Sequence, residues 1–104
     1  MTSLKRIALF GSTGSIGKQA LDVIAANPDK FSATILTAQT NAELLIQQAL
    51  QFSPSIVVIG DEKKYETVKQ ALSPKNIKVF TGEDGLEEAA VANDYDLMIA
   101  GIVG

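Results

Sequence analysis

The sequence contains no cysteine and no histidine, and these two absences exclude several kinds of chemistry. Without cysteine, the chain can form neither disulfide bonds nor a thiolate nucleophile. Without histidine, it lacks the commonest general base and the commonest metal ligand. We therefore expect no catalytic or metal centre built on either side chain.

Strong charge and long apolar runs are lacking too. The net charge is −3 with no basic cluster, so neither nucleic acid nor an anionic membrane surface is an expected partner. No segment is apolar for long enough to span a bilayer, and the N-terminus has no signal-like apolar region, so the expected location is cytoplasmic. A chain of 104 residues that is 46% hydrophobic is expected to form one small packed domain.

The most informative feature that is present is a glycine-rich segment at residues 11–17, Gly-Ser-Thr-Gly-Ser-Ile-Gly. It follows an apolar predicted strand at 6–10 and leads into a predicted helix at 15–26. A strand, a glycine turn and a helix in this order form a cradle for nucleotide phosphates. A tight turn without a ligand would not require three glycines and three hydroxyl residues.

Each glycine has an expected role in that cradle. Gly11 permits the sharp exit from the strand, and Gly17 lets the helix pack closely on it. Gly14 lets backbone N–H groups approach a pyrophosphate, which the partial positive charge of the helix start also attracts. The segment therefore predicts dinucleotide binding.

Apolar runs and helical patterns alternate along the whole chain, which is typical of an α/β fold with a parallel sheet. We expect a Rossmann-like doubly wound sheet of five strands in the order 4-3-2-1-5, with helices on both faces. Its switch point then lies beside Gly11. The expected strands are 6–10, 32–37, 56–59, 77–80 and 97–103, and the expected helices are 15–26, 41–52, 62–72 and 82–91.

No helix follows the last expected strand, which ends with the chain. A complete dinucleotide-binding domain would continue with further units, and an enzyme would add a substrate-binding part. We therefore expect residues 1–104 to be an N-terminal cofactor-binding domain that is truncated at its C-terminal end.

The choice of nucleotide depends on the residues after the second strand. NAD-specific folds place an acidic residue there for the ribose hydroxyls. The segment 37–41 has no carboxylate, which favours NADP over NAD, but it also has no lysine or arginine for a 2′-phosphate. Gln39, Thr40 and Asn41 offer neutral donors, although a helix cap alone would explain Thr40 or Asn41.

The chain resembles a known family at several points. Residues 7–17, the segments Leu-Asp-Val-Ile at 21–24 and Asn-Pro-Asp-Lys-Phe at 27–31, and the end Ala-Gly-Ile-Val-Gly at 100–104 are similar to the N-terminal domain of 1-deoxy-D-xylulose 5-phosphate reductoisomerases. Phe-Ser-Pro at 52–54 fits the same pattern. The matches keep their order over the whole chain.

The resemblance implies a cofactor-binding part of an enzyme that converts 1-deoxy-D-xylulose 5-phosphate to 2-C-methyl-D-erythritol 4-phosphate, a step of non-mevalonate isoprenoid synthesis. It implies NADPH, a divalent Mg²⁺ or Mn²⁺ ion, a phosphosugar substrate and a homodimeric parent enzyme. The metal ligands and catalytic residues would lie beyond Gly104, so the chain alone is expected to be inactive. Besides Gly11 and Gly17, the resemblance implies cofactor contacts at three places. At the pyrophosphate these are Thr13, Gly14, Ser15 and Ile16, and at the adenosine ribose they are Gln39, Thr40 and Asn41. Near the nicotinamide they are Ala100, Gly101 and Ile102.

One departure from the family concerns the 2′-phosphate. The family often has Ala-Gly-Lys-Asn after the second strand, whereas this chain has Gln39 and Thr40 in place of the glycine and the lysine. How the phosphate would be held is therefore open.

Other functions remain as alternatives. A non-catalytic NAD(P)-binding sensor could use the same cradle, as could another reductase such as a semialdehyde dehydrogenase. Tyr65 and Lys69 have the Tyr-x-x-x-Lys spacing of short-chain dehydrogenases, but Tyr65 lies on an apolar helical stripe and is expected at the edge of the core. The acidic residues of 83–88 match the first turns of a helix better than a metal site.

Overall fold

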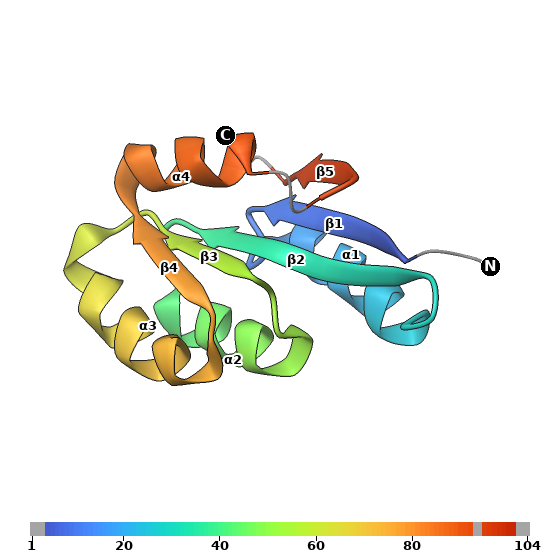
Figure 1. Ribbon diagram of the computed structural model, residues 1–104, viewed down its shortest axis with the longest axis horizontal. Helices are drawn as coiled ribbons and strands as arrows, with labels where there is room; N and C mark the ends of the chain where they lie inside the picture. The colour runs from blue at the N-terminus through green and yellow to red at the C-terminus, as the bar shows by residue number, and fades with distance from the viewer. Residues whose placement is uncertain (1–3, 93–94, 102–104) are drawn as a thin grey trace.

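The computed structural model describes residues 4–92 and 95–101, and it contains a single five-stranded sheet with helices on both faces (Figure 1). Two short 3-10 turns flank the third helix. The elements are β1 (Lys5–Phe10), α1 (Ser15–Ala26), β2 (Phe31–Ala38), α2 (Ala42–Phe52), β3 (Ile56–Ile59), η1 (Glu62–Lys64), α3 (Tyr65–Leu72), η2 (Ser73–Lys75), β4 (Lys78–Thr81), α4 (Gly82–Val91) and β5 (Leu97–Ala100).

The predicted sheet is confirmed in both order and direction. The strands lie in the order β4-β3-β2-β1-β5 and all their pairings are parallel. In Figure 1, α1, α2 and α3 cover one face and α4 lies on the other. The connection from β4 to β5 therefore crosses the opposite face of the sheet from the three earlier connections. The switch point of the sheet falls between β1 and β5. The carboxyl end of β1 thus lies where ligands bind in open α/β sheets.

The burial of the strands follows from their composition. β3 is four consecutive apolar residues, and all four are buried. Because successive side chains point to opposite faces, Val57 and Ile59 join the cluster under α1–α3, while Ile56 and Val58 join the smaller cluster under α4. β3 is therefore covered on both faces of the sheet, and the predicted strand at 56–59 is confirmed.

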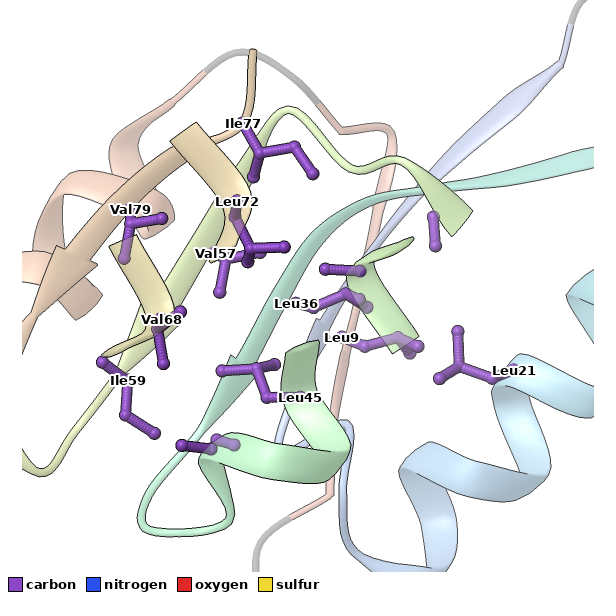
Figure 2. Close-up of a cluster of buried hydrophobic side chains, with 14 of the residues drawn as sticks. Leu9, Leu21, Leu36, Leu45, Val57, Ile59, Val68, Leu72, Ile77 and Val79 are labelled. Carbon is purple, nitrogen blue, oxygen red and sulfur yellow. The ribbon is translucent and has the colours of Figure 1, made fainter. Parts of the chain in front are cut away.

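The larger cluster holds the three helices of one face against the sheet (Figure 2). Leu45 of α2 and Leu72 of α3 are fully buried in it, as are Leu9 and Leu36 of the neighbouring strands β1 and β2. Truncating any such leucine to alanine typically costs about 2–5 kcal/mol, so this cluster accounts for much of the stability of the sheet and helix layers.

Several predicted boundaries need small corrections. The predicted third helix at 62–72 is wrong in its first turn, because residues 62–64 form a 3-10 turn in which the Asp61 carboxylate accepts the Lys63 N–H at 3.0 Å. β1 and β2 are each longer than expected, and β4 lies one residue later, at Lys78–Thr81. The predicted last strand, 97–103, is too long, because β5 ends at Ala100 and Gly101 lies outside it; 102–104 lie outside the described residues.

β5 is attached to the sheet through β1 and an ion pair at its amino end. The Arg6 guanidinium lies 3.1 Å from the Asp96 carboxylate, which also accepts the Arg6 backbone N–H at 2.8 Å. These hydrogen bonds from Arg6 hold the pKa of the Asp96 carboxyl below its usual range. Leu97 and Met98 of β5 are 47% and 41% exposed, so this strand is less covered than the others.

Candidate cofactor site

The glycine turn leaves β1 at the switch point and lies directly against the end of β5. Gly11 has φ +93°, a conformation that side chains rarely adopt. A Cβ on Gly11 would also lie 2.5 Å from the Gly101 carbonyl oxygen. The Gly101 N–H donates to the Phe10 carbonyl at 2.8 Å. Residues 90 positions apart in the sequence therefore meet at one point, which brings the predicted residues Ala100 and Gly101 to the glycine turn.

Gly17 brings the helix against that turn. A Cβ on Gly17 would lie 2.4 Å from the Gly11 carbonyl oxygen and 2.5 Å from the Ser12 Cα. These are backbone atoms, so no side chain could rotate away to make room. The predicted close packing at Gly17 is thus present in the structure.

The start of α1 and the turn before it present backbone N–H groups for which the described part of the chain offers no acceptor. Gly14 is the N-cap, with φ −80° and ψ 176° and no side-chain cap. Within 4–92 and 95–101, no protein acceptor is found for the N–H groups of Thr13, Ser15 and Ile16. Any residue can adopt the Gly14 backbone angles, so the fold does not explain this glycine. Free amides at a helix start, with a glycine beside them, fit the pyrophosphate of a dinucleotide.

Two neighbouring elements hold the turn in place. Thr37 of β2 accepts the Gly11 N–H at its hydroxyl oxygen, at 3.0 Å, and the Ser12 N–H at its carbonyl, at 2.8 Å. Gln48 of α2 clamps Ser12: its amide oxygen accepts the Ser12 hydroxyl at 2.7 Å and its NH₂ donates to the Ser12 carbonyl at 3.0 Å. Ser12 and Gln48 are both buried. This pair was not predicted from the sequence, where a polar glutamine in the apolar stripe of α2 is the signal that could have indicated it.

Replacing Gln48 with leucine should destabilise the chain by about 2–3 kcal/mol, because the buried hydroxyl and carbonyl of Ser12 would lose their partners. Chemical denaturation at neutral pH measures the effect. Gln47→Leu is the matched control, since Gln47 is the exposed neighbour on the same helix and should change stability by about 0.5 kcal/mol or less. Equal effects of the two substitutions would show that the clamp on Ser12 contributes nothing.

The predicted adenosine segment forms the tip of β2 and the start of α2. The Asn41 carboxamide oxygen accepts the Leu44 N–H at 3.2 Å, so Asn41 caps α2 as one of the sequence alternatives proposed. The Gln39 side chain lies over Gly60, where an added Cβ would be 2.5 Å from the Gln39 amide oxygen. Gln39 and Thr40 are exposed just beyond the carboxyl end of β2.

A cleft of about 760 Å³ opens beside Gln39 and Thr40, at the carboxyl ends of β2, β3 and β4. Its charged lining consists of Asp61, Glu62, Lys63, Glu83 and Asp84. At its edge, the Lys64 ammonium donates to the Thr40 carbonyl at 2.7 Å. Lys64 was missed in the sequence because it lies 24 residues from Thr40; the predicted adjacency of the second and third strands was the signal that could have found it.

The other candidate residues form no second site. Tyr65 of α3 packs against the larger core cluster, as predicted, and the Lys69 ammonium lies 5.5 Å from the centre of its ring. The described residues contain no group of acidic side chains suited to a metal ion, so no metal ligand is assigned to this part of the chain. Among the helices that the structure describes, none is long and apolar enough to cross a membrane. Ile102 lies outside the described residues, so its predicted place near the nicotinamide has no structural description.

Comparison with solved structures identifies close structural relatives of this fold. The reductoisomerase of Zymomonas mobilis, solved in complex with NADPH, superimposes with a TM-score of 0.90 and 33% identity over 98% of this chain and 27% of that one. A second reductoisomerase, solved with NADPH, fosmidomycin and magnesium, gives a TM-score of 0.89 at 28% identity over 97% of this chain and 25% of that one.

Sequence comparisons agree with the structural ones. The reductoisomerase of Porphyromonas gingivalis is 46% identical and that of Bacteroides thetaiotaomicron 48% identical, each over 96% of this chain. The chain spans 26% of the length of these relatives. The family model described as 1-deoxy-D-xylulose 5-phosphate reductoisomerase matches residues 7–104. With the glycine turn, the strand order and these relatives in agreement, this chain belongs to the 1-deoxy-D-xylulose 5-phosphate reductoisomerase family.

Proposed function

We propose that this chain is the N-terminal NADPH-binding domain of a reductoisomerase that acts on 1-deoxy-D-xylulose 5-phosphate. The observation that carries the proposal is the set of N–H groups at the start of α1 that have no acceptor among residues 4–92 and 95–101, placed at the switch point of the sheet. Thr13, Gly14, Ser15 and Ile16 hold the pyrophosphate there, where the helix dipole adds a favourable potential. Gly11 and Gly17 allow the turn and helix to come that close.

The two ends of the cofactor then extend in opposite directions from the turn. Gln39, Thr40 and Asn41 lie at the tip of β2 and face the adenosine ribose. Ala100 and Gly101 lie at the end of β5, against Gly11, and flank the nicotinamide, with Ile102 following them in the sequence. Bound NADPH supplies the hydride of the reduction. The part of this chain is to bind and orient the dinucleotide.

The rest of the reaction belongs to the full-length enzyme. Relatives solved with magnesium and with fosmidomycin support a divalent metal and a phosphosugar substrate, neither of which is assigned to residues of this chain. The product would be 2-C-methyl-D-erythritol 4-phosphate, and the chain alone would be inactive. The homodimeric parent, the cytoplasmic location and the truncated domain stay predictions. Neither a sensor nor a semialdehyde dehydrogenase is favoured, since the family match covers residues 7–104.

Calorimetric titration of the chain with NADPH, and with NADH for comparison, tests the proposal. We expect saturable binding of both, with NADPH binding more tightly, because the tip of β2 carries no acidic residue for the ribose hydroxyls. Tighter binding of NADH would contradict the assignment of NADPH. Absence of saturable binding of either nucleotide would contradict the proposed function as a whole.

A further inference from the structure

Lys64 brings a positive charge to the tip of β2, because residues 37–41 themselves contain no lysine or arginine. Its ammonium donates to the Thr40 carbonyl at 2.7 Å. A lysine ammonium has three donors, so two remain for another acceptor at the same place. No carboxylate among residues 4–92 and 95–101 forms an ion pair with it. Its charge is therefore available to an anionic ligand.

The backbone that carries Lys64 is held firmly to β2. Beyond the last paired residues of β2 and β3, the Gly60 N–H donates to the Ala38 carbonyl and the Asp61 N–H to the Gln39 carbonyl, each at 2.8 Å. The Lys64 N–H then closes the turn on the Asp61 carbonyl at 3.0 Å. Lys64 is thus the last residue of η1 and the N-cap of α3, on a loop that extends the parallel ladder, and its position over Thr40 follows from this pairing.

The charges around Lys64 make its ammonium important for binding a phosphate at this place. The adjacent cleft is lined by four carboxylates and one lysine: Asp61, Glu62, Glu83 and Asp84, with Lys63. A phosphate dianion is repelled by that lining and attracted to the edge where Lys64 lies. An ammonium paired with a phosphate also forms a charge-assisted hydrogen bond, which is stronger than one between neutral groups.

We propose that Lys64 determines the preference of this chain for NADPH over NADH by pairing with the 2′-phosphate of the adenosine ribose. The inference rests on the proposed function, since it requires the ribose to lie at Gln39–Asn41. The segment 37–41 contains no lysine or arginine, and Lys64 brings a positive charge to it from η1, after β3.

The test compares the affinities of NADPH and NADH by calorimetric titration of the wild-type chain and of Lys64→Met. We expect about tenfold weaker binding of NADPH to the variant, the usual effect of losing one hydrogen bond to a charged group. NADH lacks the phosphate, so its affinity should change by about twofold or less, through screened long-range charge only. Lys64→Arg should keep the preference.

Two lysines give matched controls for the change in net charge. Lys63→Met alters the adjacent residue of the same loop. Lys75→Met alters a lysine of η2, which precedes the amino end of β4, whereas Lys64 lies at the carboxyl ends of the strands. We expect a small loss of NADPH affinity in Lys63→Met and none in Lys75→Met. A greater loss from Lys63→Met, or an equal loss of both nucleotides in Lys64→Met, would overturn the assignment to Lys64.

The outcomes separate this inference from the proposed function. If the wild type binds both nucleotides and Lys64→Met keeps the same preference, this inference alone is overturned. If the wild type binds neither nucleotide, the proposed function fails and this inference fails with it.

Discussion

Replacing Gly17 with alanine should destabilise the chain by about 3 kcal/mol or more, although alanine is the better helix former. The added Cβ would lie within 2.5 Å of the Gly11 carbonyl oxygen and the Ser12 Cα. Relief requires the whole turn to move away from α1. The turn resists this movement because Thr37 accepts two of its N–H groups and Gln48 holds Ser12.

The direction of the Gly17→Ala effect distinguishes two explanations. Helix propensity alone predicts that alanine stabilises the helix by about 1 kcal/mol, whereas the close approach predicts a large loss. Urea unfolding followed by circular dichroism measures the difference. Lys18→Ala, at the exposed next position, is the control and should change stability by about 0.5 kcal/mol or less. A Gly17→Ala protein as stable as the wild type would mean that α1 does not pack on the turn as described.

Replacing Gly14 with valine should abolish most nucleotide binding and leave the fold intact. The Gly14 backbone, at φ −80° and ψ 176°, lies in a region that valine adopts without strain. The branched side chain would occupy the space through which the pyrophosphate approaches the amides of Ser15 and Ile16. Losing two hydrogen bonds to a charged group, at about 1.5 kcal/mol each, weakens binding about 100-fold or more.

The pyrophosphate is common to both nucleotides, so Gly14→Val should weaken NADPH and NADH equally. This separates it from Lys64→Met, which should weaken the binding of NADPH far more than that of NADH. Gly14→Ala, with a smaller side chain, should give an intermediate loss, and the stability of both variants should stay within about 1 kcal/mol of the wild type, as for other N-cap changes. Undiminished NADPH affinity in a folded Gly14→Val chain would place the pyrophosphate elsewhere.

Most of the fold could be predicted because its signals are local. The apolar run at 56–59, Asn27 before Pro28 and the glycines of 11–17 each act on residues within a few positions of themselves. Strand order followed from the alternation of strands and helices, since crossovers are right-handed and the glycine turn marks the switch point. The first turn of the third predicted helix was wrong because Asp61 caps a 3-10 turn there, a choice that one hydrogen bond decides.

The contacts that shape the candidate site could not be predicted in the same way. Ser12 and Gln48 are 36 residues apart, Thr40 and Lys64 are 24 apart, and Gly11 and Gly101 meet across the switch point. Each contact depends on which strands are neighbours and on how far a side chain or loop reaches across them. Local pattern placed a phosphate cradle at the end of β1 because a strand, a glycine turn and a helix start adjoin in the chain. Only the tertiary structure brought Gln48 against Ser12 of that turn and Lys64 to Thr40 at the tip of β2, because packing joins segments that the sequence separates.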